Sequence, residues 1–429
     1  MSTPYMSSRQ AAEKWGISDR RVRVLCSEGK IPGAVKQGRS YRIPVNAKKP
    51  VDGRDRPKRQ HRFLKWDNAI IATIDSANTV KFSERDFNPV VSLYTHGADN
   101  WSGERFAEFL SERTVSRDRR DIEKILFRCG LSTYDVLRIA EITRGIHAKD
   151  LLWIANSEDE QLDSAITDVF DSVFHQRIDL VGESVDTPEG YNIKRYGAHC
   201  GQYGIYKQRI SPLTADVESE VAVYLLAQEL GVPCCPAYRI DKDTGFSAFL
   251  YDFSKEYIVH FRSLFDGARS GNEYQNLASV RPQYKDDIAK MILLDFITRQ
   301  DDRHLSNIAI KVSNGVESFY PLYDNGRSLF YEDTEEMVQA AVAEPEKYAT
   351  TFGYSGTYWD YVKEIAEERG GLSDLLKLDI AESKVVDILK EAGFAGYRLT
   401  GATQWIMKAI EMVKNGPHLA RRQDEGMRT

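Results

Sequence analysis

The chain has 429 residues, 42% of them hydrophobic and 28% charged, which supplies at least one sizeable core and predicts two to four domains at roughly one per ~150 residues. No apolar run approaches the ~18 residues of a spanning helix, so the sequence predicts a soluble, cytoplasmic protein with no membrane partner. The five cysteines are scattered and form no CxxC pair, which argues against a disulfide framework and a zinc ribbon. Residues 1–65 hold 17 Lys and Arg against 5 Asp and Glu, so this end carries +12 while the other 364 residues carry −18, a pattern that favours a nucleic-acid-facing end on an acidic body.

Residues 3–47 have the pattern of a small separate unit. A serine cap before QAAEKW and a terminal Gly16 predict a first helix, and Ser18 and Gly29 bracket a second one. The following stretch, IPGAVKQGRSYRIP, predicts two short strands around a tight turn.

This stretch, from MSSRQAAEKW to GRSYRIP, resembles the winged helix-turn-helix of excisionase and MerR-type proteins. The resemblance implies a DNA-binding domain over residues 1–47, in which the start of the second helix faces base edges and the strands form a wing. The side chains expected at DNA are basic or aromatic ones of the second helix and the wing: Arg20, Arg21, Arg23, Lys36, Arg39 and Tyr41. A protein-binding module with a solvated basic face is the alternative. A unit this small binds DNA weakly, so a homodimer or a partner is also expected.

Residues 48–62 are charged, contain proline and have almost no apolar side chains, which predicts a basic linker. Residues 63–180 contain several amphipathic stretches of helical period, including WSGERFAEFLSER and TYDVLRIAEITRG. They predict a mostly helical intermediate region without a catalytic constellation.

From residue 181 the sequence pattern predicts short strands, such as GQYGIYKQR and FSAFLYDF, separated by polar turns. Between these strands the stretch DVESEVAVYLLAQELG predicts an amphipathic helix. Beyond residue 254 the pattern is mainly helical. A strand-rich lobe over 181–254 and a larger helical lobe over 255–429 predict an α+β fold, with a ligand site in the crevice between the lobes.

The segment DFITRQDDRHLSNIAIKVSNGVESFYPLYDNG carries the most chemical information. A polar loop leads into a predicted hairpin, so residues of the loop and residues just after the hairpin lie at the same end. Asp302, Asn307 and Asp324 are therefore expected to converge. Phosphoryl transfer needs a carboxylate that accepts the hydroxyl proton and hard oxygen ligands for magnesium. Asn307 follows Asp302 by five residues, as in protein kinases, and DNG stands where those have DFG.

The motifs DRHLSN (302–307) and LYDNG (322–326) resemble those of the HipA-like family of serine/threonine kinases, a resemblance that covers roughly residues 120–420. It implies a two-lobed protein-kinase-like fold, with the kinase small lobe over 181–254 and the large lobe over 255–429. It further implies ATP and Mg²⁺ as cofactors, Asp302 as the catalytic base, and Asn307 and Asp324 as magnesium ligands.

The family pattern also requires a strand lysine for the ATP phosphates and an acidic helix residue that holds it. Lys207 matches best, with Lys194 as the competitor, and the acidic partner is Glu220 or Glu218. A phosphate loop is placed at residues 186–191, where Thr187 and Gly190 are expected at ATP.

Two further side chains of the loop have supporting roles in this interpretation. His304 is expected to hold the loop rather than to act as an acid. Arg303 is expected to neutralise the adjacent Asp301 and Asp302, or to meet a phosphate.

The leading hypothesis is a HipA-type serine/threonine protein kinase with a DNA-binding module in cis, acting on a protein substrate as a toxin–antitoxin or regulatory kinase, with an antitoxin or regulator as a partner. One alternative is a transcriptional regulator whose kinase-like body only binds a nucleotide or a partner. The other is a small-molecule kinase on the same fold.

Overall fold

The computed structural model describes residues 5–27, 29–38, 40–45, 47–49, 61–120, 122–166, 194–252, 255–265, 272–349 and 356–416. The chain divides into two compact units, Met1–Gln60 and His61–Thr429. Among these described residues, no helix combines the length and the apolar character that crossing a membrane requires.

The first unit is a helix-turn-helix followed by a hairpin. It contains β1 (Tyr5–Ser7), α1 (Ser8–Trp15), α2 (Asp19–Ser27), β2 (Val35–Gln37) and β3 (Ser40–Pro44). The strands form an antiparallel sheet in the order β1-β3-β2. Ser7 caps α1 in a capping box with Gln10, and Gly16 ends the helix with a left-handed φ of 64°. Both predicted helices and both predicted strands are present.

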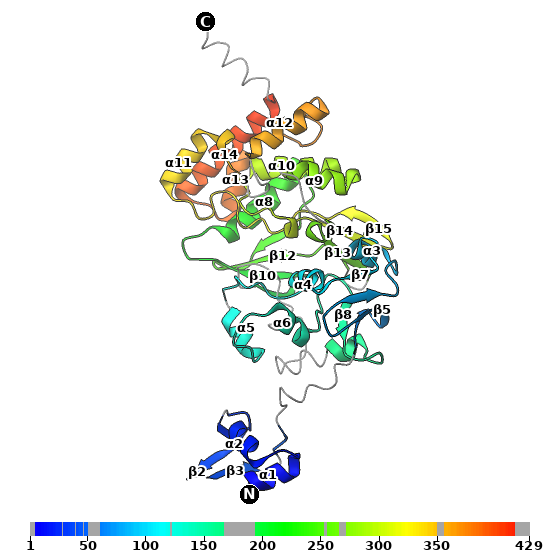
Figure 1. Ribbon diagram of the computed structural model, residues 1–429. Coiled ribbons are helices and arrows are strands. Elements are labelled where there is room, and N and C mark those ends of the chain that lie inside the picture. Colours follow the sequence, from blue (N-terminus) through cyan, green and yellow to red (C-terminus); the bar gives the residue numbers. More distant parts are fainter. Residues whose placement is uncertain are drawn as a thin grey trace. The chain divides into compact units, whose positions relative to one another are not determined.

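The described residues of the second unit form three antiparallel sheets, accompanied by helices (Figure 1). A five-stranded sheet, ordered β7-β6-β5-β4-β8, is built from β4 (Arg62–Trp66), β5 (Ala69–Ile74), β6 (Val80–Phe82), β7 (Asn100–Trp101) and β8 (Leu152–Ala155). The same part of the chain contains α3 (Pro89–Thr95), α4 (Gly103–Ser111), α5 (Ile122–Arg128) and α6 (Val136–Thr143), and residues 162–166 are helical as well.

The prediction that residues 63–180 are mostly helical is therefore wrong for the part that the structure describes. The amphipathic stretches do form α4, α5 and α6, but the five-stranded sheet was missed. Its strands are two to six residues long, and short apolar runs such as AIIATI cannot be told from buried helix segments by their period.

A four-stranded sheet, ordered β11-β12-β10-β9, forms the strand-rich lobe, with α8 (Asp216–Leu230) packed on it. Its strands are β9 (Lys194–His199), β10 (Gln202–Gln208), β11 (Ala237–Arg239) and β12 (Thr244–Ala248). A three-stranded sheet, ordered β13-β14-β15, follows with β13 (Glu256–His260), β14 (Ala309–Ser313) and β15 (Val316–Phe319).

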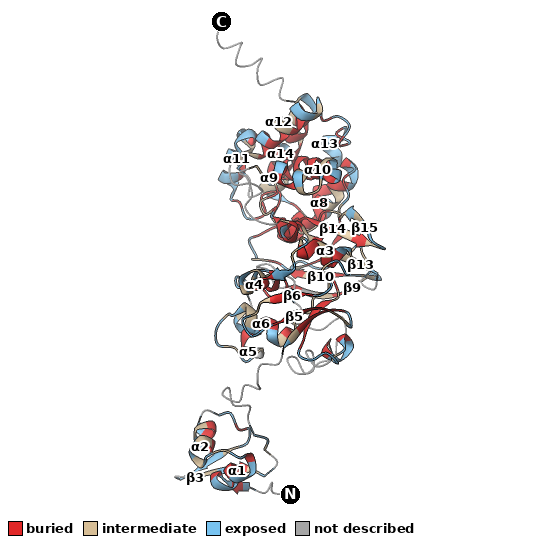
Figure 2. Ribbon diagram, turned by 45° about the vertical axis from the view of Figure 1, so that its right-hand side comes forward, coloured by how far each residue is buried: buried red, intermediate tan, exposed pale blue. Residues whose placement is uncertain are grey.

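The remaining helices gather at the end of the unit opposite the five-stranded sheet (Figure 1). They are α9 (Glu273–Val280), α10 (Lys285–Ile297), α11 (Glu335–Ala343), α12 (Tyr358–Arg369), α13 (Glu382–Ala392) and α14 (Gly396–Asn415). Helix α10 is buried on nearly all sides, and Trp405 of α14 donates from Nε1 to the Phe296 carbonyl of α10 at 3.0 Å. Figure 2 shows the buried residues running through the interior of the unit, while outer helices such as α11 turn exposed faces to solvent.

The strand-rich lobe and the helical lobe are joined beside the DNG segment. The backbone N–H of Cys235 donates to the Leu322 carbonyl at 2.8 Å, and the N–H of Leu322 donates to the Pro233 carbonyl at 3.0 Å. These bonds fix the end of the strand-rich lobe against the residues that lead into Asp324.

Candidate active site

The β9–β10 hairpin brings two lysines to one place. Lys194 and Lys207 are direct cross-strand partners, so both side chains project from the same face of the sheet. Both are buried and both line one cavity between the lobes.

Lys207 is held by two carboxylates. Its Nζ lies 2.8 Å from Oε2 of Glu220 on α8 and 2.8 Å from Oδ1 of Asp324. Ser247 of β12 donates to the other Glu220 oxygen, Oε1, at 3.2 Å. Burial alone would lower the pKa of Lys207, but the charges of Asp324 and Glu220 outweigh it and raise the pKa above its ordinary value.

Of the two competing candidates, Lys194 shares a carboxylate with Lys207 and Glu218 pairs with a different cation. Lys194 contacts Asp324 Oδ2 at 3.3 Å, and Glu218 forms a buried ion pair with Arg209 at 2.7 Å. Lys207 and Glu220 therefore face each other, as the resemblance requires, whereas Glu218 points to a different cation.

Asp324 lies just beyond the β14–β15 hairpin in a left-handed conformation, with φ at 57°. Burial would raise its pKa, but Lys194 and Lys207 more than compensate and hold the pKa well below the usual value. Gly326 follows it and passes close to α8: an added Cβ would lie 3.2 Å from the Asp216 carbonyl and 3.2 Å from Glu220 Oε2. The glycine of DNG thus allows Glu220 and Asp324 to approach the same lysine.

Asp302 and Asn307 belong to the loop between α10 and β14. Nδ2 of Asn307 donates to the Asp302 carbonyl at 2.9 Å, which leaves Oδ1 as the amide atom able to bind a cation. The Asp302 carboxylate is about one-third exposed, at 35%, and its Oδ2 lies 3.6 Å from Nη1 of Arg327. Burial raises the pKa of Asp302, and Arg327 partly opposes that shift.

Arg303 ties this loop to the rest of the helical lobe. It is fully buried and forms a two-point ion pair with Asp295 of α10, at 2.9 and 2.8 Å. It also donates to the carbonyls of Asn307 and Tyr323, at 3.2 and 3.0 Å, and to Oδ1 of Asn325 at 2.7 Å. The expectation that Arg303 neutralises its two acidic neighbours or meets a phosphate is wrong, because Asp295 lies inside the lobe and needs a buried cation.

His304 follows Arg303 in the same loop but is exposed toward the cavity. Its Nδ1 accepts from the Ser306 N–H at 3.2 Å and thereby caps the short 3₁₀ helix Leu305–Asn307. Desolvation of the ring by the surrounding cavity walls lowers its pKa, although the charges of Asp302 and Asp324 oppose the shift. The contact is of the loop-holding kind that the sequence led us to expect.

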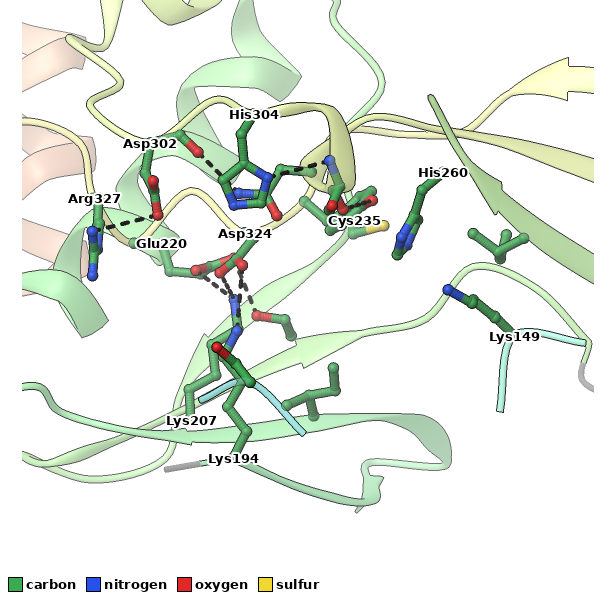
Figure 3. Close-up of a pocket in the computed structure, with 18 of the residues that line it drawn as sticks. Lys149, Lys194, Lys207, Glu220, Cys235, His260, Asp302, His304, Asp324 and Arg327 are labelled. Atoms are coloured by element: carbon green, nitrogen blue, oxygen red, sulfur yellow. Dashed lines mark hydrogen bonds and ion pairs between the residues drawn. The ribbon is translucent and has the colours of Figure 1, made fainter. Parts of the chain in front are cut away.

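The two lysines, Glu220, Asp302, His304, Asn307, Asp324 and Arg327 line one cavity of about 860 Å³. Figure 3 shows Lys207 reaching from its strand to Glu220 and Asp324, with Lys194 beside it and the Asp302–Arg327 pair to one side. A carboxylate and an amide oxygen from Asp324 and Asn307 are the hard oxygen donors that Mg²⁺ prefers. The arrangement suits an anionic ligand held by lysines together with a divalent cation.

Some of the expected site residues lie outside the described part of the chain. Thr187 and Gly190 of the predicted phosphate loop do so, and so does Arg39 of the predicted wing.

In the first unit, Arg20 and Arg23 are exposed on the first turns of α2, and Arg21 is half-buried. Arg23 forms an ion pair with Asp19. The wing residue Lys36 is exposed and Tyr41 is half-buried. Arg20, Arg23 and Lys36 are thus at the surface of this unit.

Sequence reasoning missed Arg327, and it missed the basic side chains that residues 63–180 and β13 bring to the cavity, Lys149 and the neutral His260 among them. Arg327 directly follows DNG, so its position along the chain was a usable signal. No signal of spacing pointed to Lys149, because more than 150 residues separate it from Asp302.

Comparison with known proteins bears on each unit separately. Residues 5–47 match the family model described as a helix-turn-helix domain. No curated protein matches the sequence significantly. A chain of the HipA, HipB and operator DNA toxin–antitoxin complex of Shewanella oneidensis MR-1 matches with a TM-score of 0.52 at 13% identity, over 82% of this chain and 99% of that chain. The Helicobacter pylori proinflammatory kinase CtkA gives a TM-score of 0.45 at 14% identity, over 55% of this chain and 93% of that chain.

The chain therefore has an N-terminal helix-turn-helix domain, and its second unit has the HipA-like fold. The predicted α+β, two-lobed, kinase-like architecture is confirmed.

Proposed function

We propose that the second unit is an ATP-dependent phosphotransferase that acts on serine or threonine hydroxyls of a protein. One observation carries this proposal: Lys207 bridges Glu220 and Asp324, at 2.8 Å each, in the cavity that Asp302 and Asn307 also line. Lysine, helix carboxylate, metal-binding carboxylate, base and amide are the parts that phosphoryl transfer requires.

Each residue has a distinct task in this proposal. Lys207, fixed by Glu220, binds and orients the phosphates of ATP. Asn307 Oδ1 and a carboxylate oxygen of Asp324 would hold Mg²⁺, which neutralises charge on the phosphates when it is bound. Asp302 orients the acceptor hydroxyl and takes its proton, a task that its raised pKa favours, because a base of higher pKa binds the proton more firmly.

Nucleotide binding also has to rearrange interactions that are present in this structure. Lys194 and Lys207 both bind Asp324, so a phosphate that attracts either lysine frees oxygen atoms of Asp324 for a cation. Asp302 similarly exchanges its 3.6 Å interaction with Arg327 for the acceptor hydroxyl.

A titration of ATP against the full chain, with and without Mg²⁺, tests the cofactor assignment. Magnesium should tighten ATP binding to the wild type, and this gain should be lost in Asp324→Asn and reduced in Asn307→Ala. Asp374→Asn, an exposed site with 69% of its side chain accessible, is the matched control and should behave as the wild type does. A gain from magnesium that survives Asp324→Asn would refute the role of this residue.

The acceptor is identified by phosphoamino-acid analysis after transfer from γ-labelled ATP to protein. Phosphoserine or phosphothreonine is expected. Label that appears only on a small molecule would favour a small-molecule kinase. ATP binding without any transfer would favour a regulator whose kinase-like body only binds nucleotide.

We further propose that the first unit binds DNA in cis and that the chain works with an antitoxin or another regulator. The helix-turn-helix match and the exposed Arg20 and Arg23 support the DNA-binding part. Gel shifts with random-sequence duplex DNA should show no complex once residues 1–60 are removed. Replacing both arginines by alanine should lower the slope of log K against log salt by about 0.9 for each phosphate that is no longer neutralised. Equal binding by the truncated chain would refute the assignment.

A further inference from the structure

The cavity that holds Lys207 and Asp324 has a second, cationic end. His147, Lys149, His260 and Arg262 all line the cavity, as does His304 of the loop that follows α10. Figure 3 shows Lys149 and His260 facing each other, on the far side of His304 from Asp302. None of these four side chains has a task in the phosphotransfer described above.

Lys149 is the most unusual of them. Only 3% of the residue is exposed, and its Nζ donates to the Glu112 carbonyl at 3.0 Å. An ammonium group has three donors, and within the described residues Lys149 forms no ion pair. A buried ammonium without a carboxylate is costly, so an anion that reaches it gains a strong charge-assisted contact.

The nearby carboxylate is already engaged. Glu112 Oε1 lies 3.5 Å from Nε of Arg262, and the hydroxyl of Ser263 donates to its other oxygen. Arg262 nevertheless remains 56% exposed, so part of its guanidinium is accessible from the cavity. The positive charge of Lys149 and Arg262 together therefore exceeds the negative charge of Glu112.

His260 connects this cationic end to the loop of Asp302. Its ring stacks on Tyr323 at 6.4 Å between centroids, and the Tyr323 hydroxyl donates to the Ser306 carbonyl at 2.8 Å. Its Nδ1 is buried and has no hydrogen-bond partner among the described residues. Burial, and then the charges of Lys149, His304 and Arg262, hold its pKa well below the ordinary value.

The five-stranded sheet and its flanking segments supply the lysine. Lys149 precedes β8, and its carbonyl accepts from the Ile258 N–H of β13 at 2.9 Å. This bond docks the part of the chain without an assigned role onto the sheet beside the catalytic loop. Asp302 lines the same cavity, so an acceptor that extends from Asp302 across His304 would reach this end of it.

We propose that the end of the cavity formed by Lys149, His260 and Arg262 is an acceptor subsite, which binds the carboxylate of an acidic residue that flanks the phosphorylated serine or threonine. This inference rests on the proposed phosphotransferase function. The subsite also assigns a role in substrate choice to the residues around β8.

Two peptide pools with a fixed serine test the subsite, one enriched in glutamate at the flanking positions and the other in glutamine. Binding to the full chain is measured by fluorescence anisotropy, and phosphorylation is measured separately with γ-labelled ATP. The glutamate pool should bind about tenfold more tightly to the wild type, the scale of one charge-assisted contact.

The variants are Lys149→Met and Arg262→Gln, with Lys81→Gln, an exposed side chain on β6, as the control. Both subsite variants should lose most of the preference for glutamate, and the control should keep it. Lys149 is buried, so Arg262→Gln serves as the second variant because the Arg262 side chain is largely exposed.

The outcomes separate the two proposals. Equal binding of the pools, no measurable binding of either, or a preference that both variants retain overturns the subsite. Phosphorylation without preference for glutamate leaves the phosphotransferase standing and removes the subsite. A preference in binding that depends on Lys149 and Arg262, without any transfer, keeps the subsite and removes the phosphotransferase.

Discussion

Replacing Arg303 should damage both the stability and the active site, because one buried side chain holds three segments together. It pairs with Asp295 of α10 and donates to the carbonyls of Asn307 and Tyr323 and to Asn325. Arg303→Met leaves the Asp295 carboxylate buried and unpaired, which should cost ~3–5 kcal/mol in the free energy of unfolding. The loss should shrink as the pH falls, because protonation removes the charge of a carboxyl whose pKa burial already raises.

A double variant separates the charge from the positioning. Asp295→Leu combined with Arg303→Met removes the unpaired charge, so part of the lost stability should return. The carbonyls of Asn307 and Tyr323 remain without their donor, at about 1–3 kcal/mol each, so recovery should be incomplete and phosphotransfer should stay low. Urea unfolding followed by tryptophan fluorescence measures the stability, and single-turnover kinetics measure the transfer. An unchanged unfolding midpoint in the single variant, or full transfer activity in the double variant, would refute this reasoning.

Three further changes have defined outcomes. Lys207→Met should lower the single-turnover rate about 10²–10³-fold, the scale for losing one charge-stabilising group, and a rate within twofold of wild type would exclude the lysine from the reaction. Gly326→Ala should weaken magnesium-dependent ATP binding, because its Cβ would press on Glu220 Oε2 at 3.2 Å, and unaltered binding would show that the segment yields easily. Arg327→Met should move the acid limb of the rate–pH profile to higher pH, because it removes the positive charge that lowers the pKa of Asp302. A shift to lower pH would contradict the interaction between Arg327 and Asp302.

Much of the fold followed from local signals. The helix-turn-helix was predictable because Gly16 and the serine cap mark its boundaries, and α8 was predictable from its length and its terminal Gly231. The five-stranded sheet was not, since its strands are short and pair across the chain, as β4 does with β8. Pairing at such separation depends on tertiary packing and leaves little trace in a single sequence.

The candidate site divides in the same way. The convergence of Asp302, Asn307 and Asp324 on one cavity was predictable, because one loop and one hairpin fix their spacing. Whether Glu218 or Glu220 faces Lys207 was undecidable from sequence, since the residues are two apart on one helix. The structure places Glu218 against Arg209 and Glu220 against the lysine.

The partners of Arg303 were misassigned for a related reason. Adjacent residues in the sequence, Asp301 and Asp302, looked like its natural counter-charges. The buried side chain turns instead to Asp295, eight residues earlier on α10. For a side chain buried in a core, closeness in sequence is a poor guide to which charged residue it pairs with.

The single-turnover rate of γ-phosphoryl transfer to a protein hydroxyl, compared between the wild type and Asp302→Asn, tests the central claim most directly. The asparagine keeps the size of the side chain but cannot take the proton, so ATP should bind with unchanged affinity while the rate falls by about 10²–10⁴-fold. Transfer by Asp302→Asn at the wild-type rate, or no transfer by the wild type with bound ATP and magnesium, would contradict the account.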